Sequence, residues 1–374
     1  MNDIVKVSVK AATVFAALAA VIILFAAGAD ISPSGILQGF RDKYIFITAM
    51  GSGYPVEVPG SRTIKAAHIT RGTAVLTDTS FVIYDSKGRT VLSEVHQFSS
   101  PSMENSRKFS LLYSRGGKDF TMRTLSGTAC SGKTENVIIC ADVCADGRFA
   151  FVTKSETTDA EIVVYSKDGT VLNKWKSVDQ KVSDISISPS GKYIAWVGLS
   201  TDNGVLVSTV NMRKIGENKN MKEYVFQDTL IADIRFEGNS MVAAVGDNFA
   251  SFMGVTGDNS FLYPYDGNNL NSYCFNDCGE LALVFSANTD GRNAWVTVIN
   301  SECLEKARIQ TDITSPLVDL ANDRISLLSG SSVCSYSYNG KLLRRSDVPV
   351  DANMILTSEG RLIAKGSITI TAVD

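Results

Sequence analysis

The segment Phe81-Val-Ile-Tyr-Asp-Ser-Lys-Gly-Arg-Thr-Val-Leu92 decides the fold of this chain. It joins an apolar run that ends in tyrosine to a second apolar run, through a polar turn with glycine four residues after the tyrosine. This pattern predicts a β-hairpin whose glycine takes the positive φ that the turn requires. The same pattern returns at Ile162–Leu172 and at Val333–Leu343.

The spacing of these hairpins indicates a repeat. Gly88, Gly169 and Gly340 lie 81 and 171 residues apart, which is about two and about four times a period in the low forties, the length of a propeller blade. A second pattern, a turn followed by a strongly apolar strand as in Asp146–Val152, recurs with turns near residues 72, 106, 147, 191, 238, 279, 323 and 360. Eight turns predict an all-β, eight-bladed β-propeller, with seven blades as the alternative.

The two ends of the repeat region predict how the ring closes. After the last turn, Leu362–Ala364 and Ser367–Ala372 supply strands, but the final blade then lacks its outermost strand. Tyr54–Val58 or Tyr44–Thr48 belongs to no other blade and is expected to fill that place, which would hide open strand edges. We therefore assign residues 44–374 to the propeller.

The N-terminus contains an uncharged run at residues 11–29. As a helix this run rises about 28 Å, close to the thickness of the hydrocarbon core of a bilayer. Lys6 and Lys10 precede it, so the sequence predicts a cytoplasmic N-terminus at 1–10, a transmembrane signal anchor at 11–29, a connector at 30–43 and an extracytoplasmic propeller. The alternative is a secreted protein released by cleavage near Ala29.

The net charge and the cysteines of the chain argue against some classes of function. The net charge of −3 gives no basic surface for nucleic acid. The chain has seven cysteines, an odd number. Two pairs have a CxxxC spacing, Cys140 with Cys144 and Cys274 with Cys278. A five-residue strand separates such a pair by about 13 Å, too far for a disulfide, and zinc would need two further ligands. These cysteines are expected to be small blade residues.

Acidic residues precede the apolar strands of several predicted blades. Asp142, Asp184 and Asp233 recur at intervals of 42 and 49 residues, and Asn271 and Asp319 occupy comparable places. A ring of carboxylates at the mouth of the central channel could bind a hard cation such as Ca²⁺ or Mg²⁺. The alternative is that these side chains bond to backbone or neighbouring-blade groups at the rim. The three aspartates are candidate binding residues, and no metal site is assigned.

Catalytic signatures are absent from the sequence. It contains no glycine-rich phosphate loop, no nucleophile elbow and no HExxH helix. His68 and His96 are 28 residues apart, and neither stands beside a serine or aspartate pattern of a catalytic triad. No cofactor and no catalytic residue is predicted.

Three features together carry a resemblance to a known family: the apolar N-terminal run, the segment Gly51–Val58 and the turn Tyr84–Gly88. The chain resembles a family of uncharacterised, membrane-anchored bacterial β-propeller proteins, defined only as a domain of unknown function. It is distantly similar to WD40-like and quinoprotein-like propellers, although it lacks the Gly-His and Trp-Asp pairs of the first and has only three tryptophans. The resemblance implies the fold and topology of essentially the whole chain and no activity.

The sequence therefore predicts a membrane-tethered, extracytoplasmic propeller that binds a protein or a glycan, or serves as a scaffold. The alternative function is a metal-assisted hydrolase or lyase that uses Asp142, Asp184 and Asp233 at the central channel. A third possibility is an assembly scaffold in an envelope export machine.

Overall fold

A computed structural model describes residues 44–287, 293–311, 313–314, 316–321 and 323–373. The chain divides into two units, residues 1–49 and 50–374. In the first unit, residues 44–47 form one helical turn. The predicted cytoplasmic segment 1–10, anchor 11–29 and connector 30–43 lie outside the described residues. Among the described residues, no helix has the length and apolar character needed to cross a membrane.

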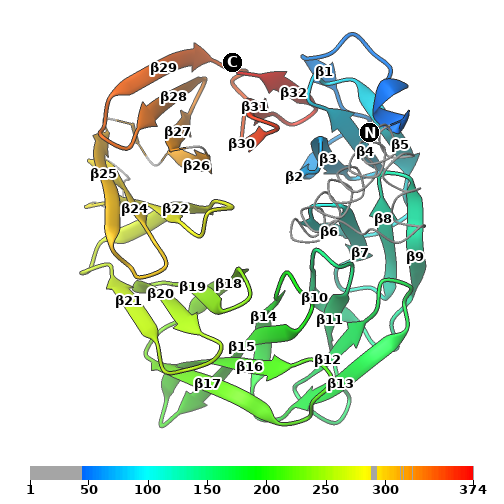
Figure 1. The fold of residues 1–374 in the computed structure, drawn as a ribbon, viewed down its shortest axis with the longest axis vertical. Coiled ribbons are helices and arrows are strands. Elements are labelled where there is room, and N and C mark those ends of the chain that lie inside the picture. Colours follow the sequence, from blue (N-terminus) through cyan, green and yellow to red (C-terminus); the bar gives the residue numbers. More distant parts are fainter. Residues whose placement is uncertain (1–43, 288–292, 312, 315, 322, 374) are drawn as a thin grey trace, which may run out of the picture. The chain divides into compact units, whose positions relative to one another are not determined.

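The second unit is a ring of eight antiparallel sheets of four strands each, and the predicted eight-bladed propeller is confirmed (Figure 1). Blades 1 to 4 consist of β2 (Thr63–Ile69), β3 (Gly72–Thr77), β4 (Ser80–Asp85) and β5 (Thr90–Val95); β6 (Pro101–Ser106), β7 (Phe109–Ser114), β8 (Asp119–Thr124) and β9 (Gly127–Lys133); β10 (Ile138–Val143), β11 (Phe149–Thr153), β12 (Ala160–Tyr165) and β13 (Val171–Ser177); and β14 (Lys181–Ile187), β15 (Tyr193–Asp202), β16 (Val205–Lys214) and β17 (Asn220–Gln227).

Blades 5 to 8 complete the ring in chain order. They consist of β18 (Ile231–Glu237), β19 (Met241–Gly246), β20 (Phe249–Gly254) and β21 (Ser260–Pro264); β22 (Asn269–Phe275), β23 (Leu281–Ser286), β24 (Ala294–Ile299) and β25 (Glu305–Thr311); β26 (Leu317–Ala321), β27 (Arg324–Ser329), β28 (Ser332–Ser337) and β29 (Leu342–Asp347); and β30 (Met354–Ser358), β31 (Arg361–Lys365), β32 (Thr369–Ala372) and β1 (Val56–Glu57).

The order of strands in a blade follows their burial. The first strand of each blade lies nearest the centre of the ring (Figure 1). The second strands are packed on both faces, as in β11, where all five residues are buried. The last strands are exposed, as in β29, where five of the six residues are exposed. Continuous apolar runs are typical of strands with two covered faces, and this is why the eight apolar strands occupy the same place in every blade.

Apolar side chains fill the spaces between neighbouring blades. At the boundary of blades 2 and 3, Phe120 packs against Phe149 and Phe151 with ring centroids 5.5 and 5.1 Å apart. Tyr165 stacks on Phe149 at 5.0 Å. Similar clusters span other neighbouring blades, so among the described residues the apolar core lies largely between blades.

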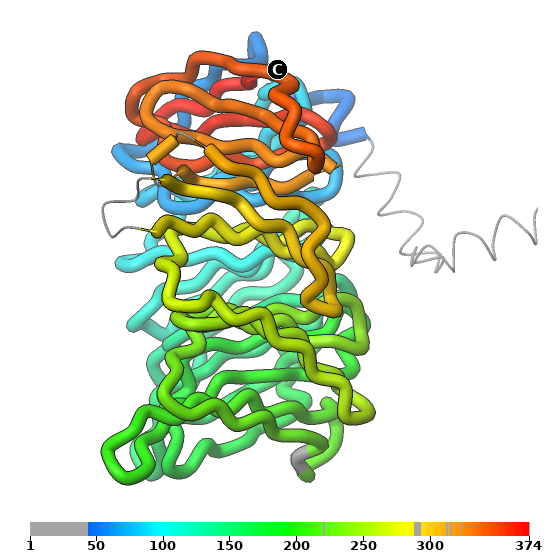
Figure 2. The backbone as a smooth tube through the Cα atoms, turned by 90° about the vertical axis from the view of Figure 1, so that its left-hand side faces the viewer, coloured from blue at the N-terminus to red at the C-terminus, as the bar shows by residue number. Residues whose placement is uncertain are grey.

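The N-terminal strand closes the ring, as predicted. In β1, Val56 pairs with Ile370 and Glu57 with Thr369 of β32. Val58 packs in one apolar cluster with residues of blade 1, such as Val75, and of blade 8, such as Ile363. Figure 2, an edge-on view of the ring, shows the blue N-terminal and red C-terminal strands at the same end.

The hairpin predicted at Phe81–Leu92 is β4–β5, the outer half of blade 1. Its counterparts are β12–β13 and β28–β29. Gly88, Gly169 and Gly340 have φ values of 84°, 86° and 80°, the left-handed region in which glycine carries no steric cost. Each of the three hairpins also has a register shift beside its tyrosine.

The alternative closing segment, Tyr44–Thr48, is not a strand, and that expectation was wrong. The amide of Thr48 donates to the carbonyl of Tyr44 at 3.2 Å, which is the spacing of a helical turn. A short apolar run forms a strand only where a partner strand supplies its hydrogen bonds, and the outer place on β32 is taken by Val56 and Glu57.

Candidate functional site

The three predicted aspartates lie on the innermost strands of three successive blades: Asp142 on β10, Asp184 on β14 and Asp233 on β18. Each accepts a hydrogen bond from the next blade. The donor is the amide of Ile187 for Asp142, at 2.7 Å, and the amide of Ile234 for Asp184, at 2.8 Å. For Asp233 it is the hydroxyl of Tyr273, at 2.9 Å. The carboxyls therefore join neighbouring blades.

Other polar side chains of the innermost strands extend this pattern. Asp319 on β26 accepts from the hydroxyl of Thr357 in blade 8 at 2.6 Å. Ser186 in blade 4 accepts from the amide of Phe236 in blade 5 at 3.1 Å. Asn271 differs, because it bonds within blade 6, accepting from Ser286 at 3.4 Å. The arrangement matches the alternative interpretation of these residues, in which they bond to neighbouring-blade groups.

Burial changes the acidity of these carboxyls. It raises the pKa of Asp142 to about 7, against the opposing effect of two backbone amides. Burial also raises the pKa of Asp184 well above its ordinary value, and the charge of Asp233 adds to the rise. Burial raises the pKa of Asp233 as well, against the opposing effect of the hydrogen bond from the Tyr273 hydroxyl. Blades 4 and 5 thus each contribute a buried carboxyl of raised pKa.

This geometry does not resemble a cation cage. Within the described residues, no group of three His, Cys, Asp or Glu side chains is placed to hold a metal ion. The oxygens of the three aspartates bond to separate partners in the next blade, whereas a hard cation needs six to eight oxygens around one point. All seven cysteines are free thiols.

The two histidines lie apart and have structural partners. Nδ1 of His68 is 3.0 Å from Oγ of Ser358, a residue 290 positions away that the fold brings across the seam between blades 1 and 8. The Ser358 hydroxyl also donates to the carbonyl of Gly72 at 2.8 Å. Nε2 of His96 lies 3.0 Å from the carbonyl of Thr77. The Ser358 hydroxyl therefore donates its proton to a backbone carbonyl, and the contact between His68 and Ser358 strengthens the closure of the ring.

The two faces of the ring differ in their apolar content. Because the strands of a blade alternate in direction, the loops that join successive blades lie on the same face as the turns between second and third strands. We call this the loop face. Within the part of the chain that the structure describes, this face presents seven large apolar side chains that are at least 40% exposed: Val95, Val178, Val205, Leu230, Leu317, Val350 and Ile368. The other exposed apolar side chains of this unit, apart from Met50, lie on or beside the outermost strands.

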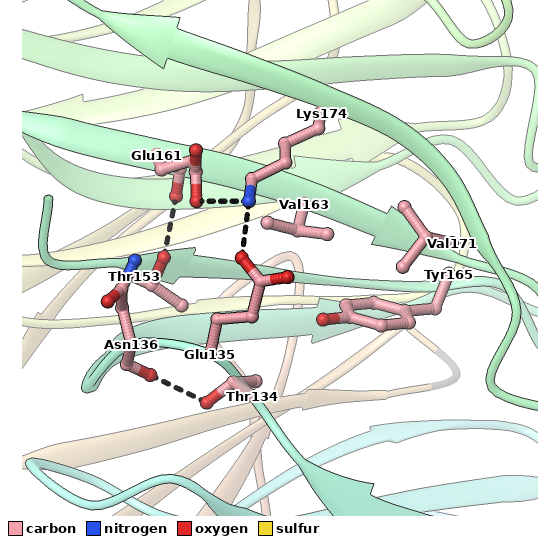
Figure 3. A pocket seen from close by; sticks show the side chains of 9 residues that line it. All are labelled: Thr134, Glu135, Asn136, Thr153, Glu161, Val163, Tyr165, Val171 and Lys174. Carbon is pink, nitrogen blue, oxygen red and sulfur yellow. Dashed lines mark hydrogen bonds and ion pairs between the residues drawn. The ribbon is translucent and has the colours of Figure 1, made fainter.

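A pocket of about 280 Å³ lies beside the outer half of blade 3 (Figure 3). Its rim includes the loop-face residues Thr134, Glu135 and Asn136, and its walls come from β11, β12 and β13. Lys174 extends between two carboxylates, 2.6 Å from Glu135 and 3.0 Å from Glu161. These two hydrogen bonds raise the pKa of Lys174 and keep it charged.

Sequence reasoning did not identify this pocket. Its one signal was Glu161, a charged residue at the start of the apolar run Ala160–Tyr165, all of which is buried. Buried carboxylates are rare unless they are paired, so Glu161 is expected to have a cationic partner. The sequence offered no means of choosing Lys174, because several lysines lie near it along the chain.

The fold is shared with solved structures of low sequence identity. The chain is similar to a eukaryotic initiation factor, with 12% identity, 81% of each chain covered and a TM-score of 0.56. It is similar to BamB from Moraxella catarrhalis, with 10% identity, 87% of this chain and 99% of that chain covered, and a TM-score of 0.54. It is also similar to Chaetomium thermophilum Sqt1 bound to the N-terminus of the ribosomal protein L10, with 10% identity, 85% and 99% covered, and a TM-score of 0.54.

The last two neighbours are BamB-like and WD40-like propellers, so the expected likeness to WD40-like propellers is confirmed. At these identities the likeness shows the fold alone. The curated proteins contain no match to this chain. The family of unknown function DUF5711 matches residues 52–371, and the chain therefore belongs to this family.

Proposed function

We propose that this propeller is a binding and scaffolding module that presents its loop face to a partner protein. The observation that carries the proposal is the set of seven exposed apolar side chains on that face. Exposed apolar surface gains free energy when a partner removes it from water. Val350 and Val95, which are 84% and 81% exposed, offer the largest gain.

The interior of the ring supports a structural role for its polar groups. Asp142, Asp184 and Asp233 are engaged between blades, which stiffens the ring and leaves the loops to make external contacts. A rigid surface loses little conformational entropy on binding. Sqt1, which has the same fold, is bound to an N-terminal segment of another protein, and this supports a protein partner for the present chain. The alternative metal-assisted hydrolase or lyase needs carboxylates that converge on one ion.

We also propose that the propeller is tethered to the membrane by residues 11–29 and lies outside the cytoplasm. The proposal rests on the uncharged run and on Lys6 and Lys10 before it. Extraction of membranes with alkaline carbonate is expected to leave the full chain in the pellet. Protease added outside intact cells is expected to reach the propeller. Release of the chain into the soluble fraction would contradict the tether, and cleavage near Ala29 would account for it.

Crosslinking in the native cells, followed by capture of the full chain, tests the partner. We expect one protein to be captured reproducibly, and at least about tenfold less of it with Val95→Lys and Val350→Lys together, because two charges would have to be buried. The matched control is Val225→Lys, since Val225 is 59% exposed on β17 rather than on the loop face. Equal capture by both variants would contradict the proposal, and recovery of a polysaccharide in place of a protein would favour glycan binding.

A further inference from the structure

In the pocket beside blade 3, the Glu135 carboxylate can leave its ion pair with Lys174 without loss of the fold. The Glu161 side chain is 7% exposed and holds Lys174, whereas the Glu135 side chain is 79% exposed on the loop between blades 2 and 3. Water screens the ion pair of Glu135 and Lys174, so this pair contributes little to stability. Glu135 can therefore turn to another cation while Lys174 stays on the buried Glu161.

The charges that line the pocket favour a positive ligand. Glu135 and Glu161 carry two negative charges and Lys174 one positive charge, which leaves a net charge of −1. Lys118 is also close, but its ammonium donates to the main-chain carbonyl of Glu135 at 2.6 Å and not to the carboxylate. A cationic group that enters the pocket would offset the net negative charge of the side chains that line it.

Tyr165 supplies a second acceptor. Its ring is buried and stacked on Phe149, while its hydroxyl points into the pocket on the side of Glu135 (Figure 3). Burial and the charge of Glu135 raise the pKa of Tyr165, so the hydroxyl stays neutral and keeps lone pairs for a donor. A carboxylate beside a phenol oxygen suits a group with several N–H donors.

The remaining walls and the size of the pocket suit a side chain. Val163 and Val171 form an apolar surface between the polar groups (Figure 3). Long basic side chains bury their methylene stems on such surfaces while their charged ends reach polar partners. The volume, about 280 Å³, falls just below the range of about 300–1,000 Å³ typical of sites for drug-sized molecules, which favours a single side chain.

We propose that this pocket binds the guanidinium or ammonium group of a basic side chain on a partner protein. The Glu135 carboxylate and the Tyr165 hydroxyl accept its hydrogen bonds, and Val163 and Val171 contact its stem. The inference rests on the proposed binding function and gives the partner a chemical feature, a basic residue that reaches the boundary of blades 2 and 3.

An NMR titration of the purified full chain with two capped tripeptides tests the inference. The probes are acetyl-Gly-Arg-Gly-amide and the same peptide with citrulline, which has the shape of arginine without its charge. We expect saturable binding of the arginine peptide and at least about tenfold weaker binding of the citrulline peptide. Glu135→Gln should weaken the arginine peptide by a similar factor, and Tyr165→Phe by at least about threefold.

The control variant is Glu156→Gln, an exposed glutamate on a neighbouring loop of blade 3, which should leave the affinity unchanged. Equal affinities for the two peptides, no saturable binding, or full affinity in Glu135→Gln would each overturn the inference. These outcomes are independent of the capture experiment. If the partner is captured through the loop face but the arginine peptide does not bind, the pocket inference alone fails. If the peptide binds but no partner depends on the loop face, the proposed function alone fails.

Discussion

Replacing Asp142 by asparagine should change how the stability of the ring depends on pH. Burial raises the pKa of this carboxyl from its ordinary value of 3.8 to about 7, so the folded state holds a proton that the unfolded chain has released. Between these two pH values the unfolded state binds fewer protons, and stability falls as pH rises. One pKa unit corresponds to about 1.4 kcal/mol, and the shift therefore amounts to about 4 kcal/mol.

The variant isolates this contribution from those of other buried acids. At pH 4 we expect Asp142→Asn to be less stable than the natural chain by about 1 kcal/mol, because the asparagine amide cannot accept from both the Val143 and Ile187 amides. As pH rises to 8, the natural chain loses stability that the asparagine variant keeps. The free energy of unfolding of the variant should therefore gain up to about 4 kcal/mol relative to the natural chain, and the order of stability should reverse.

Urea unfolding of the full-length chain at half-unit steps from pH 4 to pH 8, followed by circular dichroism, measures the difference. The control is Asp159→Asn, a change at an exposed loop residue of the same blade. A constant difference between the natural chain and Asp142→Asn across this range would refute the reasoning. It would mean that the two backbone amides keep the folded-state pKa near that of the unfolded chain.

Two further pairs of variants test the pocket and the hairpin turn. Lys174→Met should lower the free energy of unfolding by about 3 kcal/mol, because it leaves the buried Glu161 without its cation. Glu135→Gln should lower it by less than about 1 kcal/mol, because the ion pair of Glu135 is exposed. Similar costs for both variants in urea unfolding would contradict the difference in burial between the two glutamates. Gly88→Ala should destabilise the chain more than Gly340→Ala in urea unfolding. Both glycines have positive φ, but a Cβ at Gly88 would lie 2.7 Å from a neighbouring backbone nitrogen, whereas a Cβ at Gly340 would meet open space. The expected costs are about 3 and about 1 kcal/mol, and equal costs would count against the close approach at Gly88.

The periodic parts of the structure follow from local chemistry, and the sequence alone determined them. A turn glycine such as Gly88 acts within a few residues, so each hairpin carries its own signal. Eight turns of one kind, each followed by an apolar strand, left little choice but eight blades. The short first strand was predicted because the last blade lacked an outermost strand and Tyr54–Val58 belonged to no other blade. The same argument could not exclude Tyr44–Thr48, because the sequence does not show which segment pairs with the outer edge of β32.

The partners of the polar groups were decided only by the tertiary structure. Asp142 and Ile187 are 45 positions apart, and His68 and Ser358 are 290 apart. Periodicity placed the aspartates on the innermost strands, but it could not show whether their carboxyls met each other or the next blade. That choice depends on how neighbouring blades pack against each other, and this packing joins residues that are far apart in the sequence. The pocket is decided in part by the same packing. Glu161 and Lys174 lie on the paired strands β12 and β13 of blade 3, whereas Glu135 reaches Lys174 from the loop between blades 2 and 3.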